Sequence, residues 1–351
     1  MSKYVGKKIE VEIFGESHAD EIGAIVKGLA GYPLYEDTIK NLLLRRKASS
    51  GVYSTSRIEP DEPIFSGVCD NVLTDEFKGI IKNVNVRKSD YDSLYGKPRP
   101  SHADYAWYVK DGALDFSGGG RFSGRLTAAY CIAGGECLGI LGEKGVKIAA
   151  YVQKVGAVDG ESYRDECKNY ETLLGVRDDG FPSLSNKEEM LSAIKEAAKT
   201  GDSVGAKIEC VVYGFPAGIG DNLFGGLEGK IAEVLYAIPA VKGVEFGYGF
   251  DLCALKGSEA NDGLRYENSN VVFESNRSGG INGGISNGNV LTIGVAMRPT
   301  PSISLPQATV DLVTKTNATI EVKGRHDPCL AVRALPVVES AVALALLDEI
   351  I

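Results

Sequence analysis

The sequence of 351 residues contains little histidine, tryptophan or methionine, with three, one and three copies respectively. It also lacks an excess of positive charge, because 38 Lys and Arg are outnumbered by 47 Asp and Glu, which gives a formal net charge of −9. Proteins that bind nucleic acid usually carry a basic face, so we expect no nucleic-acid partner. A local group of arginines is more informative against this acidic background.

The seven cysteines are widely spread, form no CxxC pair and lack zinc-site spacing from the histidines. We therefore expect reduced, mostly buried thiols and no metal site. The longest strongly apolar run, residues 341–347, ends at Asp348 and is too short to cross a bilayer. The chain starts on a strand-like alternation rather than a signal peptide. These features predict a cytoplasmic protein that does not contact membranes.

The sequence does contain alternating strand and helix signals, without a linker or an internal repeat. We predict strands and helices over the following residues: strands at 9–13, 207–212 and 290–297, and helices at 36–47, 121–138, 221–238 and 336–351. Asn186 and Glu189 suggest a capping box for a further helix that ends at Gly201. The last helix is apolar on nearly every face and should lie between other layers. We expect a surface loop over 48–63 and the least order over 159–185.

Each of the three histidines lies in a short polar motif with a carboxylate within three residues. The motifs are Gly-Glu-Ser-His18, Arg99-Pro-Ser-His102-Ala-Asp-Tyr and Gly-Arg-His326-Asp-Pro-Cys. Histidine exchanges protons near neutral pH, so we predict that these distant motifs form one site. His18 is a candidate general acid or a turn residue that caps a helix, and His102 is a candidate neighbour of an anionic substrate or a surface residue. Asp327 is a candidate base or an N-cap.

Several segments are candidates for binding an anion. Gly118-Gly119-Gly120 precedes Arg121, Ser123 and Arg125, which suggests a helix N-terminus that attracts phosphate, or else a tight turn with solvated arginines. Residues 278–289 hold five glycines and are either a second backbone cradle or a cluster of turns. Together with 298–302 they could line a flat anionic cofactor. A basic group, Arg45, Arg46, Lys47 and Arg57, is either a solvated face or a site for a multiply anionic small molecule.

These motifs, taken together and in this order, resemble the chorismate synthase family. The likeness includes Gly-Gly-Gly-Arg121-x-Ser123-x-Arg125-x-Thr-Ala, Gly-Gly-Ile-x-Gly283-Gly-Ile-Ser-Asn-Gly, Ala240-Val-Lys-Gly-Val-Glu and Arg333-Ala-x-Pro-Val-Val-Glu, and it covers nearly the whole chain. The resemblance implies an α+β fold in which residues 1–351 form a single β-α-β sandwich, with helices packed between antiparallel sheets. It also implies a homotetramer.

The activity that the resemblance implies is a lyase reaction. Such an enzyme removes phosphate and a proton from 5-enolpyruvylshikimate 3-phosphate by an anti-1,4 elimination, which gives chorismate. The cofactor would be reduced FMN, with no net redox change and with NADPH as a possible indirect reductant. By the same resemblance, His102 would protonate the departing phosphate, His18 would manage the protonation state of the flavin, and Asp327 would assist removal of the proton.

The resemblance also assigns binding residues by position. The residues matched to cofactor contacts are Arg121, Phe122, Ser123, Pro239, Ala240, Gly283, Arg298, Pro299, Thr300, Pro301, Ser302 and Arg325. The residues matched to, or available for, the anionic substrate or NADP are Arg46, Arg57, Arg99, Arg125 and Arg333.

The chain departs from the family pattern at several positions. Val52 and Ser117 occupy positions where cations are expected, and Leu126 replaces a glutamate. Ala19-Asp20 follows His18 where glycine is usual, and 73–80 replaces a threonine-glycine-threonine-proline stretch. Two hypotheses follow: a divergent working enzyme, or a paralogue that keeps the flavin scaffold for a binding, regulatory or altered-substrate role. The presence of His18, His102 and Asp327 together favours the first.

Overall fold

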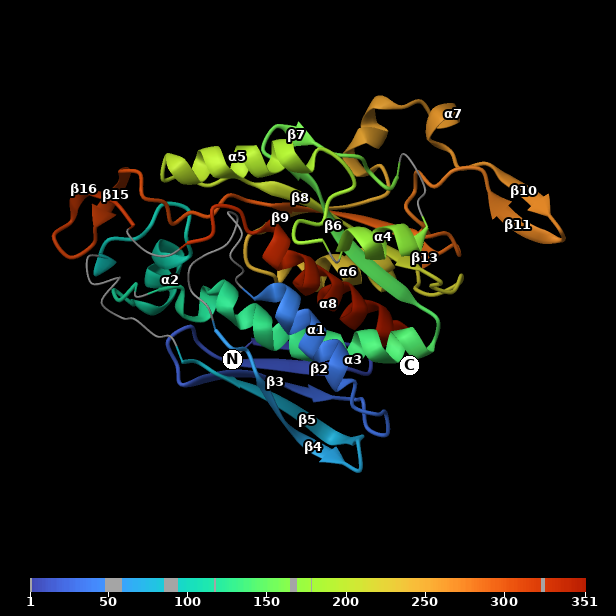
Figure 1. The fold of residues 1–351 in the computed structure, drawn as a ribbon, viewed down its shortest axis with the longest axis horizontal. Coiled ribbons are helices and arrows are strands. Elements are labelled where there is room, and N and C mark those ends of the chain that lie inside the picture. The colour runs from blue at the N-terminus through green and yellow to red at the C-terminus, as the bar shows by residue number, and fades with distance from the viewer. Residues whose placement is uncertain are drawn as a thin grey trace.

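The computed structural model describes residues 2–47, 59–84, 94–116, 118–164, 169–177, 179–322 and 326–351. Two antiparallel five-stranded sheets enclose a layer of long helices (Figure 1). In the view of Figure 1 the first sheet lies at the bottom, the helices lie in the middle and the second sheet lies above them. This arrangement confirms the predicted sandwich of helices between antiparallel sheets.

The first sheet is built from the N-terminal part of the chain. Its strands, in spatial order, are β1 (Ser2–Val5), β2 (Glu10–Gly15), β3 (Glu21–Lys27), β5 (Val72–Lys82) and β4 (Pro63–Cys69). Ile22, Ala24 and Val26 alternate along β3 and are buried. One face of the sheet therefore packs on the helices, as the period-2 pattern requires.

The second sheet is covered on both faces. Its strands, in spatial order, are β7 (Val158–Asp159), β6 (Lys147–Val155), β8 (Ala206–Tyr213), β14 (Leu291–Met297) and β9 (Val241–Phe246). On β6, Ile148 and Val152 join the main core, whereas Tyr151 packs in a second cluster with Leu173 of α4 (Tyr170–Arg177). This cover on both faces is consistent with the nearly continuous burial of β6 and β14.

The helical layer consists of α1 (Glu36–Arg46), α3 (Thr127–Glu143), α6 (Leu227–Tyr236) and α8 (Ala331–Ile350). α3 and α8 approach closely at Gly134, where a Cβ would lie 2.1 Å from that of Ser340. Only glycine allows this separation. α8 is buried along nearly its whole length, which confirms the prediction for the apolar C-terminal helix. Among the described residues no helix is long and apolar enough to span a membrane.

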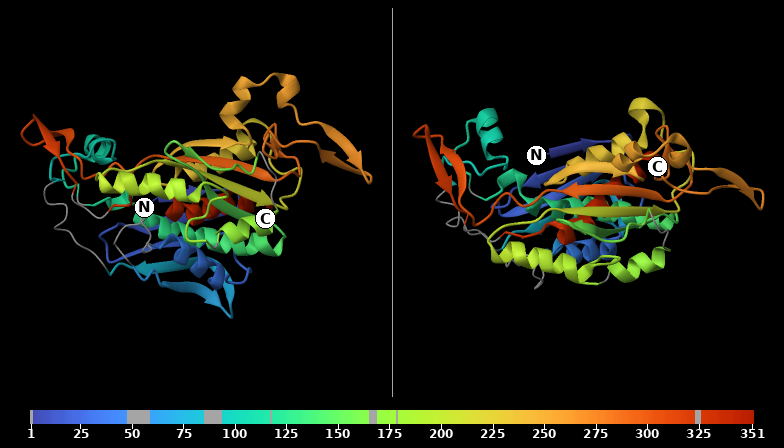
Figure 2. Two further views of the ribbon diagram at one scale, coloured as in Figure 1. Left: turned by 45° about the horizontal axis from the view of Figure 1, so that its top comes forward. Right: turned by 90° about the horizontal axis from the view of Figure 1, so that it is seen from above.

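Smaller elements extend from both ends of the sandwich (Figure 2). At one end lie α2 (Asp104–Asp111) and the hairpin of β15 (Gln307–Asp311) and β16 (Thr316–Ile320). At the other end are α7 (Gly257–Ala260), β10 (Leu264–Glu267), β11 (Asn270–Phe273), β12 (Ile281–Asn282) and β13 (Ile285–Ser286). α5 (Lys187–Lys199) lies beside β6 and β7.

The predicted strands at 207–212 and 290–297 and the helix at 36–47 are confirmed within one residue. The helix predicted from 121 begins only at Thr127, because two 3₁₀ turns, Gly120–Phe122 and Gly124–Leu126, precede it. The capping box at Asn186 was wrong. Asn186 has a left-handed backbone (φ 53°), and its Nδ2 donates 2.7 Å to the Asp159 carbonyl instead.

The prediction of a surface loop over 48–63 is also wrong for the part of this range that the structure describes, residues 59–63. Residues 48–58 lie outside the described residues, but Glu59 and Asp61 are 5% and 4% exposed, and Pro63 already begins β4. Two buried carboxylates in a polar segment require partners that compensate their charge. For Asp61 those partners are two arginines of the site described next.

Candidate active site

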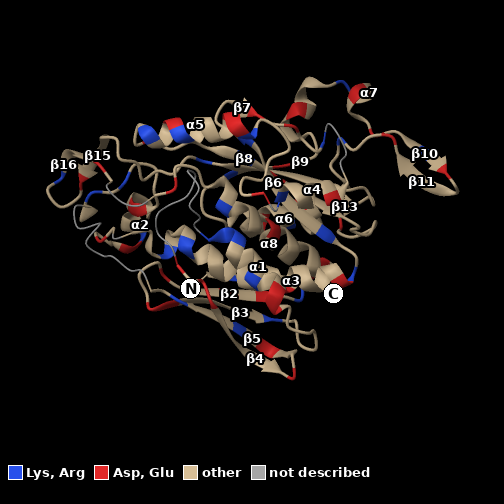
Figure 3. Cartoon of the chain, viewed as in Figure 1, with Lys and Arg blue, Asp and Glu red and all other residues tan. Residues whose placement is uncertain are grey.

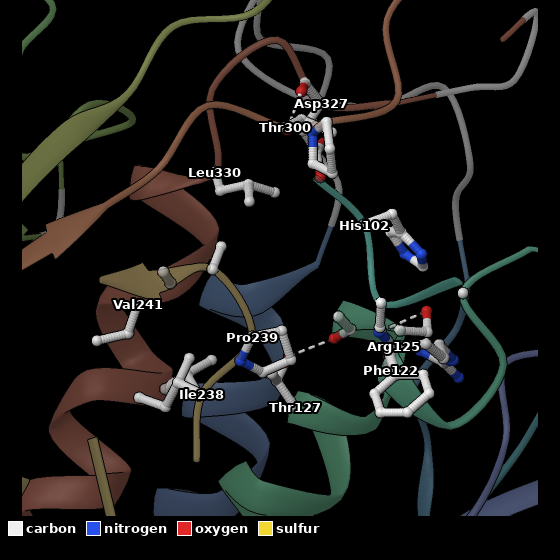
Figure 4. A pocket seen from close by; sticks show the side chains of 18 of the residues that line it. His102, Phe122, Arg125, Thr127, Ile238, Pro239, Val241, Thr300, Asp327 and Leu330 are labelled. Atoms are coloured by element: carbon white, nitrogen blue, oxygen red, sulfur yellow. Dashed lines mark hydrogen bonds between the residues drawn. The ribbon is translucent and has the colours of Figure 1, made fainter. Parts of the chain in front are cut away.

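One cavity of about 1030 Å³ is lined by residues from distant parts of the chain, among them all three histidine motifs. It lies where the C-terminal end of α1, the turns before α3 and the first turns of α8 meet the 99–107 motif and the segments around β9 and β14. All three histidines line it, as the sequence predicted. Figure 4 shows His102, Phe122 and Arg125 on one side of the cavity, with Ile238, Pro239 and Val241 facing them and Asp327 at one end.

The first histidine motif is attached to the glycine turn before α3. The Ser17 backbone N–H donates 3.3 Å to the Gly120 carbonyl, and Asn83 Nδ2 donates 2.7 Å to the Ala19 carbonyl. Gly118 has a φ of +59°, and a Cβ placed there would lie 2.2 Å from His18 Nε2. The imidazole of His18 therefore rests directly on a position that only glycine can fill.

His102 belongs to a buried, charge-assisted cluster. Its Nδ1 lies in hydrogen-bonding contact with Asp104 Oδ1, and Arg99 donates to Asp104 through Nε (2.7 Å) and Nη2 (2.8 Å). Burial alone would raise the pKa of Asp104, but the hydrogen bonds from Arg99 and His102 outweigh it and lower the pKa to about 2. Asp104 is therefore ionised at neutral pH, and it orients the ring so that the Nε2 side is available to a ligand.

Asp327 follows the third histidine and is anchored to α8. Its Oδ2 accepts a hydrogen bond of 2.6 Å from Arg333 Nη1, and its carbonyl accepts one of 2.9 Å from Thr300 Oγ1. Arg333 Nε in turn donates 3.1 Å to the carbonyl of Arg46, the last residue of α1. The carboxylate is thus held at the junction of α1, α8 and the turn after β14.

Arg46 and Arg125 lie side by side at the same junction and share one carboxylate. Arg46 Nη1 donates 3.2 Å to Asp61 Oδ2, and Arg125 Nη1 donates to Asp61 Oδ1. All three side chains are at most 6% exposed. Burial lowers the pKa of Arg46 to about 10, with Arg333 and Arg125 acting in the same direction and Asp61 opposing them. Arg46 therefore remains cationic at neutral pH.

His326 lines the cavity with its Nε2 buried and without a hydrogen-bond partner in the described part of the chain. Burial lowers the pKa of His326 to about 4, and the charges of Arg99 and His102 contribute in the same direction. The ring is therefore neutral near pH 7. A neutral imidazole can either donate or accept one hydrogen bond through Nε2.

The opposite side of the cavity is apolar, and its rim is aromatic. Ile238, Val241 and Met297 contribute hydrocarbon surface from the segment before β9, from β9 and from β14 respectively. Trp107, the single tryptophan, lies 4.8 Å from the guanidinium carbon of Arg121 and 5.5 Å from the ring of Phe122, measured to its ring centroid. This combination suits a planar ligand with an apolar face and an anionic group.

The cavity is strongly cationic in an otherwise acidic chain. Of the described residues that line it, nine are Lys or Arg and three are Asp or Glu. Figure 3 shows basic segments at the C-terminal end of α1 and just before α3, on the two sides of this junction. A cleft with this excess of positive charge concentrates small anions, and its buried guanidiniums favour phosphate and carboxylate.

Most of the predicted site residues line this one cavity. They are His18, His102 and Asp327; Arg121, Phe122, Ser123, Pro239, Ala240, Arg298, Thr300, Pro301 and Ser302; and Arg46, Arg99, Arg125 and Arg333. Pro299 belongs to the same turn but is not part of the lining. Arg57 and Arg325, and the departing positions Val52 and Ser117, lie outside the described residues.

Gly283 is not brought to the cavity. It occupies the turn between β12 and β13, and β13 lies at the opposite end of the molecule from α2 (Figure 1). Gly283 and Gly284 have φ values of +63° and +87°, so a two-residue hairpin explains both glycines. Of the two readings for residues 278–289, the cluster of turns fits the fold.

The sequence did not indicate Asp61 or Trp107 as parts of the site, and it placed the His326 motif there without a separate role for the His326 side chain. Two buried arginines require a counter-charge, and this need is the one signal that points to Asp61. The residues next to Asp61 in the sequence do not indicate that it is buried. Trp107 lies only two residues beyond Tyr105, the last residue of the His102 motif, and could have been included with that motif. His326 is adjacent to Asp327, and the motif alone does not show that its ring is buried against the cavity.

Comparison with known proteins agrees with this geometry. Residues 9–351 match the family model described as "Chorismate synthase". The chain is 39% identical over 352 residues to the "Chorismate synthase" of Dehalococcoides mccartyi strain 195, covering 99% of this chain and 96% of that protein. It is 40% identical over 350 residues to that of Thermococcus kodakarensis, covering 99% and 97%.

A solved structure, "Crystal Structure of Chorismate Synthase", superposes with a TM-score of 0.75 at 26% identity. It covers 98% of this chain and 92% of the other. The match over nearly the whole length, in sequence and in fold, shows that the chain belongs to the chorismate synthase family.

Proposed function

We propose that this chain is a working chorismate synthase, which eliminates phosphate from 5-enolpyruvylshikimate 3-phosphate. One observation carries the proposal: His18, His102, Asp327 and five buried or half-buried arginines line the same cavity as an apolar surface. A binding or regulatory paralogue would have no need to keep the proton-handling groups beside the anion-binding groups. Family membership over the full length supports the enzyme over that alternative.

The cavity fits reduced FMN as the cofactor. An isoalloxazine ring requires an apolar surface on its faces and polar groups at its edge, and its phosphate requires cations or free N–H donors. The apolar side around Ile238 and Val241 meets the first requirement, and Arg121 and Arg298 meet the second. His326 Nε2 is a buried polar atom without a partner among the described residues, as expected where a ligand supplies it.

We assign the cofactor to three segments of the cavity. These are the turn before α3 with Arg121, Phe122 and Ser123, the segment before β9 with Pro239 and Ala240, and the turn after β14 with Arg298, Thr300, Pro301 and Ser302. When bound, reduced FMN supplies electron density that aids loss of the substrate phosphate without net redox change. Gly283 is left out of this assignment because it lies outside the cavity.

The chain's own groups bind the substrate and handle protons. Arg46, Arg125 and Arg333 surround the junction at Asp327 and offer charged donors to the phosphate and carboxylates of the substrate. His102 is oriented by Asp104 and stands beside Arg99, so it can donate a proton to phosphate as it leaves. Asp327, whose carboxylate accepts a hydrogen bond from Arg333, takes the proton that the substrate loses at the other end of the eliminated system.

His18 completes the proton-handling set. Its ring is fixed on Gly118 at the base of the glycine turn, close to the segment assigned to the cofactor. A histidine there can adjust its protonation to the charge of the reduced cofactor near neutral pH.

Two further proposals concern organisation: residues 1–351 form one domain, because both sheets share the helical layer, and four copies form a homotetramer. NADPH would act only as an indirect source of reducing equivalents.

The cofactor assignment can be tested by following Trp107 fluorescence during an FMN titration. Trp107 is the single tryptophan and contacts Arg121 and Phe122, so FMN binding should quench its emission in a saturable manner. Arg121→Ala should weaken FMN at least about tenfold if its charge-assisted contact is lost. A titration without saturation would contradict the assignment.

The activity itself can be tested in a bacterial strain that lacks chorismate synthase. Expression of this chain should restore growth without added aromatic amino acids, whereas expression of His102→Asn at the same level should not. Growth with neither protein, under conditions where a chorismate synthase from another source restores it, would contradict the proposed function.

A further inference from the structure

Asp61 occupies an unusual position between two guanidinium groups that face the same cavity. Its two carboxylate oxygens accept separately from Arg46 and Arg125, and the side chains of the three residues are 1%, 3% and 6% exposed respectively. Asp61 comes from the segment before β4, whereas the arginines come from the end of α1 and the turn before α3. One carboxylate thus ties together three parts of the chain.

Two further donor atoms of Arg46, Nε and Nη2, also bind protein atoms. Its Nε donates 2.8 Å to Thr127 Oγ1, and its Nη2 donates 2.9 Å to the Gly124 carbonyl. Arg46 is therefore locked between α1 and the start of α3. Its charge acts on the cavity from a fixed position.

Arg125 differs from Arg46 in one respect. Its Nε donates 2.9 Å to Asn83 Oδ1 and its Nη1 donates to Asp61, but its Nη2 has no hydrogen-bond partner within the described residues. The Nη2 atom is buried, and Arg125 lines the cavity. A buried cationic donor without a partner is costly, so it marks a place where a ligand oxygen is expected.

The orientation of Arg125 depends on a balance of charge. Arg46, Arg125 and Arg333 lie close enough that Arg333 and Arg125 both act to lower the pKa of Arg46, whereas Asp61 acts to raise it. Without the carboxylate, Arg46 and Arg125 would repel each other across a buried contact. Asp61 has a φ of +52°, an uncommon conformation for a residue with a Cβ, so the fold accepts some backbone strain here.

We propose that Asp61 is a positioning residue, which holds the guanidiniums of Arg46 and Arg125 in place so that Arg125 Nη2 faces the anionic substrate. This inference rests on the proposed function, because it takes the substrate phosphate or a carboxylate as the ligand of Nη2. Asp61 does not touch the reacting atoms. Its effect on substrate is exerted through the two arginines.

Two simpler roles for Asp61 predict different results. If Asp61 only neutralises positive charge, its removal makes the cavity more cationic and should tighten binding of an anionic substrate. If Asp61 only stabilises the fold, its removal should lower the melting temperature and leave the affinity of the folded protein unchanged. Positioning predicts weaker binding, because a displaced guanidinium no longer meets the ligand oxygen.

The experiment compares wild type with Asp61→Asn at equal FMN saturation. We expect the dissociation constant for 5-enolpyruvylshikimate 3-phosphate to rise at least about tenfold, a change typical of a lost charged contact. The dissociation constant for FMN should change by less than about twofold. Tighter or unchanged substrate binding by the folded variant would overturn the proposal.

Glu209→Gln serves as the matched control. Glu209 is also a buried carboxylate, but it lies on β8 outside the cavity, where it accepts from Ser162 Oγ (2.5 Å) and the Tyr163 backbone (2.8 Å). This variant should lose stability without a change in substrate affinity. A comparable loss of affinity in Glu209→Gln would show that the effect of Asp61→Asn is only general destabilisation.

A second measurement does not depend on substrate. In ¹⁵N-resolved spectra of arginine side chains, the Nη groups of Arg46 and Arg125 should rotate slowly in wild type, and at least one should rotate fast in Asp61→Glu. The glutamate keeps the charge that folding requires but moves the carboxylate by one methylene. If the Nη groups of both arginines still rotate slowly in Asp61→Glu, the proposed positioning role is wrong. Failure of wild type to bind the substrate at all would instead refute the proposed function, while the spectra still report on Asp61.

Discussion

Glu136 lies on α3, inside the helical layer, and is fully buried. Its Oε2 accepts a hydrogen bond of 3.1 Å from the backbone N–H of Tyr35 at the start of α1, and its Oε1 has no partner within the described chain. Burial raises the pKa of Glu136 from its usual 4.5 to about 7, and the Tyr35 hydrogen bond only partly opposes this. We predict that Glu136 makes the protein less stable as the pH rises.

The direction and the size of this change in the free energy of unfolding follow from the linkage between proton binding and folding. Below pH 4.5 the carboxyl is protonated in both the folded and the unfolded state, so it carries no penalty. Between pH 4.5 and 7 the unfolded chain loses the proton and the folded protein keeps it, so the free energy of unfolding falls. Above pH 7 the full penalty applies, about 3 kcal/mol, because each pKa unit is worth about 1.4 kcal/mol.

The assay is urea denaturation of wild type and Glu136→Gln at intervals from pH 4.5 to 8.5. Glutamine is nearly isosteric with the protonated acid and cannot ionise. We expect the variant to gain about 3 kcal/mol relative to wild type across this range, whatever their difference at pH 4.5. The exposed Glu188→Gln serves as a control and should parallel wild type. Parallel curves for Glu136→Gln and wild type would refute the reasoning.

Three further predictions concern the cavity. Asp327→Asn should bind FMN normally but slow single-turnover elimination by at least about 100-fold, the usual contribution of a general base, and a normal rate would remove Asp327 from the mechanism. Burial lowers the pKa of His326 to about 4, so its ring should remain neutral at pH 6 in ¹⁵N spectra, which are simple because the chain has only three histidines. For the same reason His326 should lower the free energy of unfolding as the pH falls from 6.5 to 4. A His326 ring that titrates near 6.5 would contradict both expectations. Gly118→Ala places a Cβ 2.2 Å from His18 Nε2 and should reduce turnover more than tenfold. Gly145 also has a left-handed backbone, but no atom lies within 4 Å of an added Cβ, so Gly145→Ala should lower the stability by only about 1 kcal/mol and leave turnover unchanged. Equal turnover in the two glycine variants would show that His18 is not constrained by the glycine turn.

Local pattern was sufficient to predict the central layers. The apolar run near the C-terminus specifies α8 because a helix without a polar face can only lie between sheets. The alternations at 9–13 and 207–212 likewise become β2 and β8. Local pattern failed where the backbone is shaped by turns, as before α3, where glycine and serine favour 3₁₀ turns over a continuous helix.

The site was only partly predictable because its charges are balanced between distant segments. Asp61 is buried against Arg46 and Arg125, which lie 15 and 64 residues away along the chain. The sequence on either side of Asp61 indicates only a polar loop. For Gly283 the sequence motif matches the family, whereas the left-handed backbone places the residue in the hairpin turn between β12 and β13, away from the cavity.

The central claim is that this cavity carries out elimination of phosphate. The most direct test is anaerobic turnover of the purified protein with chemically reduced FMN and 5-enolpyruvylshikimate 3-phosphate, in which phosphate and chorismate are measured together. We expect phosphate and chorismate to be released in equal amounts over many turnovers per FMN. Saturable binding of flavin and substrate without release of either product would contradict it.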